Sequence, residues 1–239
     1  MSERFFLPAP PAAGRALLTG DEARHLGRVL RAEPGDTVIL FDGSGRSWTA
    51  RVDRIDRDTV ALDVVAERPP APAAGPRLTL AVALPKGDRQ KWLIEKLTEL
   101  GVHRFVPLDA TRGVAEGSAA ARARLERVVI EACKQCGRDT LMEITAARPL
   151  AAILAEPPAG GRILIADPQG APPAALAAGI SLAAGDTIAL VGPEGGFTPD
   201  ELAAADAGGA IRVSLGPHIL RVETAAIALA AVHGRLRTW

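Results

Sequence analysis

Residues 191–201 read Val191-Gly192-Pro193-Glu194-Gly195-Gly196-Phe197-Thr198-Pro199-Asp200-Glu201, a glycine-rich loop between two patterned segments. The short apolar run at residues 186–191 predicts a buried strand. After the loop, Thr198, Pro199 and Glu201 have the order of an N-cap, a first-turn proline and a capping-box acid, so a helix begins there. A loop at the carboxyl end of a strand lies where doubly wound sheets hold ligands. The stretch therefore predicts an α/β fold with a candidate ligand site.

The loop lacks the features of a phosphate cradle. No Lys-Ser or Lys-Thr pair follows its glycines, and their spacing is not G-x-G-x-x-G. Its glycines and proline instead predict a sharply turned backbone whose N–H and C=O groups approach a flat ligand closely. A tight strand-to-helix turn without a ligand is the alternative at this stage.

Composition is that of a globular chain of one large or two modest domains. Of the 239 residues, 48% are hydrophobic and 23% charged. Aromatic residues make up 3% and tyrosine is absent, which disfavours a base-stacking platform. The 28 basic and 28 acidic residues balance, but residues 77–149 hold 13 Lys and Arg against 9 Asp and Glu. This basic middle part suits an anionic substrate.

Neither a membrane nor a metal is expected. The first residues lack the apolar core of a signal peptide, and no apolar run reaches the roughly 18 to 20 residues of a membrane helix, so we expect a cytoplasmic protein. Cys133 and Cys136 form one C-x-x-C within a helical pattern, without a second cysteine pair or a neighbouring histidine. Half a site does not complete tetrahedral zinc coordination, and we expect reduced thiols on a helix.

A Pro/Ala/Gly-rich stretch at residues 69–76 predicts a linker between a domain at 1–70 and a domain at 77–239. In the first domain, short β-rich runs separated by turn residues predict a small β-barrel or meander; they lie at residues 37–41, 48–55 and 59–65.

A helix is expected at residues 21–31 of the first domain. Leu26, Val29 and Leu30 would form its apolar stripe. The basic residues fall on another face and are Arg24, His25, Arg28 and Arg31. This face is either a solvated basic surface or an RNA contact.

In the second domain, strand and helix patterns alternate, which predicts a mostly parallel sheet covered on both faces. The strand patterns lie at residues 78–84, 104–108, 143–147, 162–166, 187–191 and 211–215, and the helix patterns at 88–100, 119–136, 150–155, 172–178, 199–207 and 219–235. The last strand also runs through a turn, Gly216-Pro217-His218, into a helix. Two such loops from nearby strands form opposite walls of one pocket.

Four segments carry a resemblance to a known family. They are LPKGDRQKWLIEKLTELGV (84–102), EACKQCGRD (131–139), LVGPEGGFTPDEL (190–202) and SLGPHILRVETAAIALA (214–230). Together they resemble the RsmE family of 16S rRNA uridine-N3 methyltransferases, within the SPOUT superfamily. RFFLP, HLGRVLR and GDTVILFDG near the N-terminus are similar to the PUA-like RNA-binding domain of that family.

The resemblance implies a SPOUT-type, trefoil-knotted parallel sheet with helices on both faces at 77–239, and a small PUA-like β-barrel at 1–70. It implies a homodimer that uses S-adenosylmethionine, without a metal, on 16S rRNA within the 30S subunit. By resemblance, one group of residues lines the cofactor pocket: Leu190, Gly192, Pro193, Gly195, Gly196, Leu215, Gly216, Ile219 and Leu220. His218 and Val222 depart from the arginine and threonine common in the family.

Uridine N3 attacks a sulfonium methyl only as its proton leaves, so the site must supply alignment and a base or a cation. We expect Arg138 and Arg221 to stabilise the anion and Glu194 to accept the proton. The alternatives are that Arg138 caps its helix or binds phosphate and that Glu194 only pairs with an arginine. The expected RNA contacts are Arg4, Arg24, His25, Arg28, Arg31, Lys86 and Arg89.

Two other functions are compatible with the sequence. One is a nucleotide-binding hydrolase or kinase-like α/β enzyme that uses the glycine loop for phosphate. The other is a ribosome-assembly factor that keeps the fold and transfers no methyl group.

Overall fold

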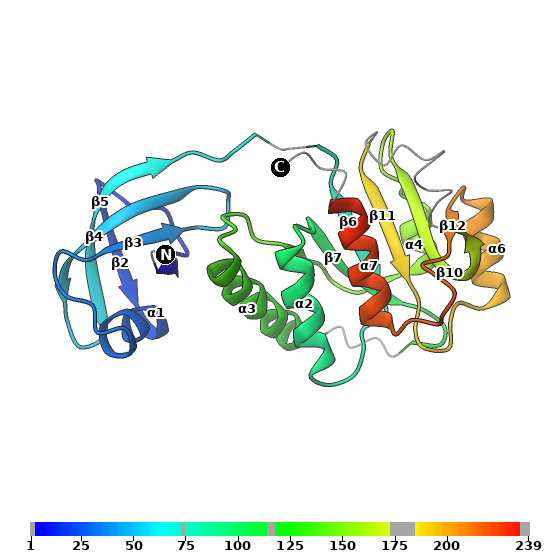
Figure 1. Ribbon diagram of the computed structural model, residues 1–239, viewed down its shortest axis with the longest axis horizontal. Coiled ribbons are helices and arrows are strands. Elements are labelled where there is room, and N and C mark those ends of the chain that lie inside the picture. Colours follow the sequence, from blue (N-terminus) through cyan, green and yellow to red (C-terminus); the bar gives the residue numbers. More distant parts are fainter. Residues whose placement is uncertain (1–2, 73–74, 114–117, 173–184, 235–239) are drawn as a thin grey trace. The chain divides into compact units, whose positions relative to one another are not determined.

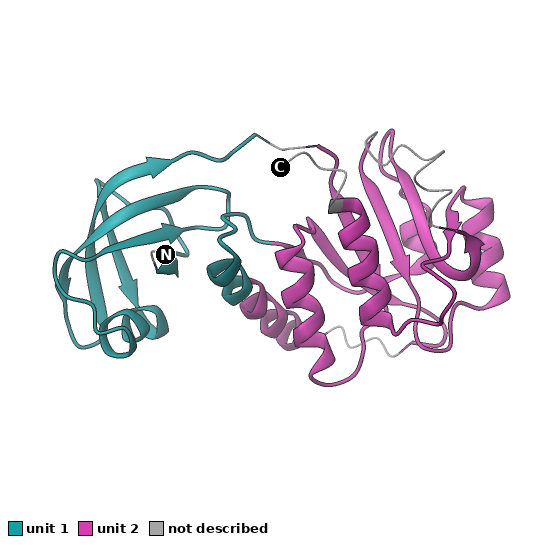
Figure 2. Cartoon of the chain, in the orientation of Figure 1, with its two compact units in different colours: residues 1–72, 130–141 teal, residues 73–129, 142–239 magenta. Residues whose placement is uncertain are grey.

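The computed structural model describes residues 3–72, 75–113, 118–172 and 185–234. Contacts divide the chain into two compact units, coloured separately in Figure 2: unit 1 holds residues 1–72 and 130–141, and unit 2 holds 73–129 and 142–239. The predicted linker lies at the first of these divisions. The sequence patterns did not indicate that residues 130–141, at the end of helix α3 (Ala119–Cys136), return to unit 1.

Unit 1 is built on a five-stranded sheet in the order β1-β3-β4-β5-β2; β2, β3, β4 and β5 are labelled in Figure 1. The strands are β1 (Arg4–Phe6), β2 (Arg15–Thr19), β3 (Thr37–Phe41), β4 (Ser47–Ile55) and β5 (Thr59–Arg68). β1 pairs with β3 in parallel, and the other pairs are antiparallel. Alternate residues are buried, as the burial of Ala16 and Leu18 on β2 shows, and they form one apolar core. The predicted β-rich domain is confirmed, and β1 and β2 are strands that the patterns did not predict.

The predicted helix at residues 21–31 is wrong in its geometry. Helix α1 (Gly20–Arg24) continues as a π-helix, η1 (His25–Val29), and Arg31 then adopts a left-handed φ of 54° that ends it. The wider π turn breaks the 3.6-residue spacing on which the apolar stripe was based. Leu26 is buried as predicted, but Val29 is 69% exposed.

Ion pairs join residues 130–141 to the sheet of unit 1. Asp139 forms a salt bridge with Arg4, and one of its oxygens accepts a hydrogen bond from Ser47 Oγ at 3.0 Å. Lys134 Nζ donates to Glu22 at 2.8 Å. Burial alone lowers the pKa of Lys134, but its hydrogen bond and charge interaction with Glu22 outweigh burial and raise it. Lys134 therefore stays charged although its side chain is only 10% exposed.

The cysteines of the C-x-x-C motif are free thiols; Cys133 is buried and Cys136 exposed. Burial raises the pKa of the Cys133 thiol to about 12, so at neutral pH it is protonated and a poor nucleophile. Within the described residues, no group of three or more His, Cys, Asp and Glu is placed to hold a metal ion. In the same part of the chain, no helix is both long and apolar enough to cross a membrane.

Unit 2 contains a seven-stranded sheet in which β12-β10-β11-β6-β7-β8 are neighbours and β9 also pairs with β7. Every pairing is parallel. The strands are β6 (Leu78–Val82), β7 (Arg104–Asp109), β8 (Glu143–Ile144), β9 (Arg148–Pro149), β10 (Arg162–Ala171), β11 (Thr187–Val191) and β12 (Ile211–Val213). The order places the ends of β10, β11 and β12 side by side.

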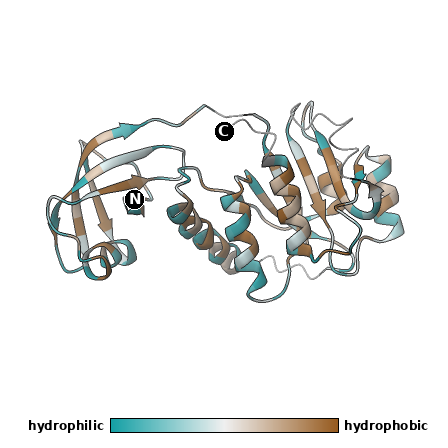
Figure 3. Cartoon of the chain, viewed as in Figure 1, coloured by the Kyte–Doolittle hydropathy of each residue, from teal (hydrophilic) through white to brown (hydrophobic). Residues whose placement is uncertain are grey.

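Helices cover both faces of this sheet (Figure 1). On one face, α4 (Leu150–Leu154) and α6 (Pro199–Ala207) bury apolar side chains against the strands. On the other, α7 (Val222–Gly234) packs on β6 and β11, with α2 (Arg89–Glu99) beside it. Figure 3 shows hydrophobic strands and helices of mixed character, as this layering requires. The predicted α/β sheet with two covered faces is confirmed, whereas the trefoil knot stays a prediction.

Most predicted elements of unit 2 are present, with two corrections near the candidate site. β12 ends at Val213 instead of residue 215, and α7 begins at Val222 instead of residue 219. Gly216, with a φ of 142°, and the following Pro217 hold residues 214–221 in an irregular conformation. The helix predicted at residues 172–178 lies almost wholly outside the described residues.

The predicted capping box at the start of α6 is confirmed. Glu201 N donates to Thr198 Oγ1 at 3.2 Å, and Thr198 N donates to the Glu201 carboxylate at 2.7 Å. The other carboxylate oxygen of Glu201 accepts from Thr111 N at 2.9 Å. One side chain therefore fixes both the start of α6 and the loop after β7.

We predict that Glu201→Gln makes stability less dependent on pH. Burial raises the pKa of Glu201, but hydrogen bonds from Thr111 and Thr198 outweigh it and lower the pKa from 4.5. The ionised group therefore stabilises the fold above pH 4.5, and this contribution is lost as the pH falls through the lowered pKa. Urea unfolding should show a deficit for Glu201→Gln at neutral pH that disappears at an acid pH below the lowered pKa.

Asp200→Asn is the matched control, because it removes a charge from the same helical turn and leaves these hydrogen bonds in place. An equal loss of stability for Glu201→Gln at both pH values would contradict the prediction.

Candidate active site

A cavity of about 280 Å³ lies at the carboxyl ends of β10, β11 and β12 in unit 2. Three segments form its walls: residues 166–168 on β10, 191–197 in the glycine loop and 213–222 at and after the end of β12. Within the last segment, Pro217 and Arg221 do not line the cavity. The volume is close to the lower end of the range for small-molecule sites, about 300 Å³. The structure thus brings the two predicted loops together and adds a third wall from β10.

All of the predicted cofactor residues except Leu190 line this cavity. They are Gly192, Pro193, Gly195, Gly196, Leu215, Gly216, Ile219 and Leu220. Leu190 is fully buried in the apolar cluster beneath the loop, where it packs with Phe197. It therefore supports the wall and does not line it.

The glycine loop lies directly on an aromatic ring. A Cβ at Gly192 would stand 2.9 Å from Cε2 of Phe197, which is closer than carbon atoms pack. Gly196 has a φ of 69°, which favours glycine. Gly196 N donates to Pro193 O at 2.8 Å and closes the turn. The backbone of the loop is thereby pressed flat against a buried ring.

Two residues that the sequence did not indicate contribute to the site: Asp167 lines the cavity, and Arg112 contacts the glycine loop. Arg112, after β7, donates from Nη1 to the Gly195 carbonyl at 2.6 Å. Asp167, after the buried part of β10, lines the cavity and accepts from Arg212 Nε at 2.6 Å and from Gln169 N at 3.0 Å. Their only sequence signal is position: Arg112 follows β7, Asp167 lies in β10 just beyond its buried residues, and the sequence does not reveal the strand order.

Glu194, the expected proton acceptor, lines the cavity and pairs with Arg89. Arg89 Nη2 is 3.5 Å from one Glu194 oxygen, and Arg89 Nη1 is 3.6 Å from an oxygen of Glu223. Pairing with an arginine was the alternative role for Glu194, and this pair is present. The sequence offered two interpretations of Glu223, a polar group that converges on the cleft or a solvent-facing helix start; in the structure it is buried.

The two expected anion-stabilising arginines lie elsewhere. Arg221 is exposed between two residues of the cavity wall, and its carbonyl accepts from Ala225 N at 2.9 Å at the start of α7. Arg138 lies in unit 1, next to Gly137 after the end of α3. The catalytic roles of both stay predictions.

Four of the expected RNA contacts of unit 1 have intramolecular partners. Arg4 is only 16% exposed in its salt bridge with Asp139, and Arg24 pairs with Asp21. Arg28 lies 3.6 Å from Asp58, and His25 packs edge-on against Phe5. Arg31, after η1, is exposed.

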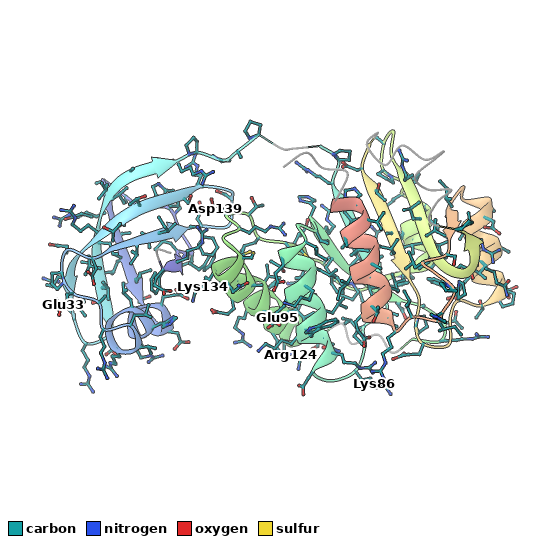
Figure 4. All side chains as sticks on the ribbon, in the orientation of Figure 1. Glu33, Lys86, Glu95, Arg124, Lys134 and Asp139 are labelled. Carbon is teal, nitrogen blue, oxygen red and sulfur yellow. The ribbon has the colours of Figure 1, made fainter. Side chains whose placement is uncertain are left out.

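Lys86 and Arg89 are the expected RNA contacts of unit 2. Lys86, labelled in Figure 4, is an exposed side chain between β6 and α2. Arg89 faces two carboxylates. RNA contact by any of these residues stays a prediction.

Comparison with known proteins identifies the family. An RNA methyltransferase domain family matches residues 73–234, and an RNA methyltransferase PUA domain family matches residues 18–65. The ribosomal RNA small subunit methyltransferase E of Mycobacterium bovis is 34% identical over 98% of this chain and 92% of its own. That of Bacillus subtilis is 30% identical over 90% of this chain and 88% of its own.

A solved structure agrees with these relatives. The ribosomal RNA small subunit methyltransferase E of Neisseria gonorrhoeae, bound to S-adenosyl methionine, superposes with a TM-score of 0.89 at 30% identity, covering 99% of this chain and 98% of that one. Together these matches span both units and nearly every residue. The chain belongs to the ribosomal RNA small subunit methyltransferase E family of RNA methyltransferases.

Proposed function

We propose that this protein transfers a methyl group from S-adenosylmethionine to N3 of a specific uridine in 16S rRNA. The observation that carries the proposal is the cavity at the ends of β10, β11 and β12, whose two glycine loops are those that the resemblance assigned to the cofactor. Membership of the family supports the same activity. The proposal also includes a location in the cytoplasm and a homodimeric state. It takes the rRNA of the 30S subunit as the substrate.

The residues of the cavity fit this cofactor. A flat adenine suits the backbone of the glycine loop, because Gly192 lies on the Phe197 ring and leaves no side chain above it. Leu215 and Leu220 add apolar surface, and the carboxylate of Asp167 suits a ligand that carries positive charge. Bound there, the cofactor supplies an electrophilic methyl group on a sulfonium.

The protein then has to align the uracil and manage one proton. Glu194 is the proposed acceptor of the N3 proton, because its carboxylate lies in the cavity wall. Arg221, between two residues of that wall, and Arg138 are the proposed stabilisers of the uracil anion. Residues 1–70 are proposed as the RNA-binding domain and 77–239 as the catalytic domain, and the family matches to residues 18–65 and 73–234 support this division.

The decisive experiment measures methyl transfer. We expect radioactive methyl from S-adenosylmethionine to appear in 16S rRNA of 30S subunits from a strain that lacks this protein, with N3-methyluridine in the digest by mass spectrometry. Calorimetry should show binding of S-adenosylmethionine and none of ATP. Tight binding of ATP alone would favour a nucleotide-dependent enzyme, and rRNA binding without transfer would favour an assembly factor.

We predict that Gly192→Ala weakens cofactor binding. The new methyl group would meet the Phe197 ring at 2.9 Å, so the loop must leave the ring. Overpacking of this kind costs about 1–3 kcal/mol, equivalent to a loss of affinity of roughly 5- to 100-fold. Calorimetry with S-adenosylmethionine measures the effect.

Gly208→Ala is the control for this variant, because a Cβ there makes only contacts of ordinary length, 3.4 Å or more, away from the cavity. Equal affinities for Gly192→Ala and Gly208→Ala would show that the ring contact does not shape the pocket.

We predict that charge reversal at Arg28 and Arg31 weakens rRNA methylation and leaves cofactor affinity intact. A lost phosphate contact weakens RNA binding and reduces its salt dependence. The apparent KM for rRNA at several salt concentrations measures the effect. Arg54→Glu, an exposed arginine on β4 of the same unit, is the matched control. Unchanged methylation at every salt concentration would show that Arg28 and Arg31 do not contribute to RNA recognition.

A further inference from the structure

Glu223 is a buried carboxylate to which the proposed mechanism gives no task. Glu223 lies in the first turn of α7, and the residue as a whole, backbone included, is 5% exposed. One oxygen lies 3.6 Å from Arg89 Nη1, and the other has no hydrogen-bond partner among the residues that the structure describes. A buried charge without full compensation is costly, and the positive end of the α7 dipole offsets only part of that cost. The guanidinium of Arg89 is therefore the main compensation for this carboxylate.

Arg89 uses different nitrogens for its two acidic neighbours. Nη1 faces Glu223 and Nη2 faces Glu194 at 3.5 Å. Exposure of the side chains rises from 7% at Glu223 through 37% at Arg89 to 60% at Glu194. The three groups thus form a chain from the interior to the cavity wall, and we call them the Glu223–Arg89–Glu194 bridge.

The bridge joins three separate elements of unit 2. Glu223 comes from α7, Arg89 is the first residue of α2, and Glu194 lies in the glycine loop between β11 and α6. The two helices pack against each other, which fixes the distance between Glu223 and Arg89. Glu194 is the most exposed of the three, and its ion pair with Arg89 restrains its position relative to this fixed pair.

The charges also argue against a phosphate contact as the main role of Arg89. A guanidinium between two carboxylates is already neutralised, and a phosphate would add a third negative group around it. Neither Arg89 nor Glu223 lines the cavity, whereas Glu194 does. Any effect of the pair on the reaction therefore passes through Glu194.

We infer that Arg89, anchored on the buried Glu223, is a positioning residue that holds the Glu194 carboxylate in the cavity wall. The inference rests on the proposed function, in which Glu194 accepts a proton. A fixed acceptor supports the reacting geometry, so loss of the bridge lowers kcat and leaves the binding of both substrates nearly unchanged.

The test compares Arg89→Gln, Arg89→Lys and Glu223→Gln with wild type. Steady-state methylation gives kcat and both KM values, and calorimetry gives the cofactor Kd. We expect Arg89→Gln and Glu223→Gln to lower kcat about tenfold with both KM values and the Kd within about twofold. Arg89→Lys should recover part of kcat, because it keeps a cation beside both carboxylates.

A second measurement does not depend on activity. The amide of Gly196 is hydrogen-bonded to Pro193 within the loop that carries Glu194, so its hydrogen exchange reports how firmly the loop is held. We expect faster exchange at residues 194–196 in Arg89→Gln and Glu223→Gln. Lys91→Gln is the matched control and should behave like wild type. Lys91 lies in the same turn of α2 and, among the described residues, pairs only with Glu95.

Each outcome decides the inference. A raised KM for rRNA with unchanged kcat in Arg89→Gln would make Arg89 a phosphate contact and overturn it. Wild-type kcat and exchange in the variants would also overturn it. If Glu223→Gln does not fold, the kcat and exchange of Arg89→Gln and Arg89→Lys decide alone. Failure of the proposed function is separate, because then wild type itself transfers no methyl group to rRNA.

Discussion

The candidate site depends on the position of β10 between β11 and β12 in the parallel sheet. All three strands point the same way, so the segments that leave their carboxyl ends meet at one edge. The glycine loop, the irregular segment before α7 and Asp167 form one cavity for this reason. If these three strands were not neighbours, the same motifs would lie on separate parts of the sheet.

Within that frame, packing and charge set the local geometry. Phe197 supports Gly192 from below, Arg112 holds the Gly195 carbonyl, and Glu201 ties the start of α6 to the loop after β7. The wall of the cavity is therefore held by contacts that do not involve a ligand. Such preorganisation limits the ordering cost of binding. Glu194 also lies in the cavity wall, and its position depends on the charges of Arg89 and Glu223.

The sequence predicted much of this arrangement and missed parts of it for identifiable physical reasons. Strong local signals gave α3, α6 and their neighbouring strands, because periodicity and capping residues are local. The helix at residues 21–31 was predicted with the wrong periodicity, since a π turn leaves no trace in a 3.6-residue pattern. Asp167 and Arg112 were missed because their importance comes from strand order, which is a property of the fold and not of the local sequence.

The contact between Arg112 and the glycine loop also limits how the sequence can vary. A Cβ at residue 195 would press on Cδ of Arg112 at 3.3 Å, while the carbonyl of the same residue accepts the hydrogen bond of that arginine. A larger residue at 195 is compatible with the loop only if the Arg112 side chain shifts by a few tenths of an ångström, which disturbs the geometry of its hydrogen bond. Positions 112 and 195 are therefore expected to covary among relatives, although 83 residues separate them in the chain.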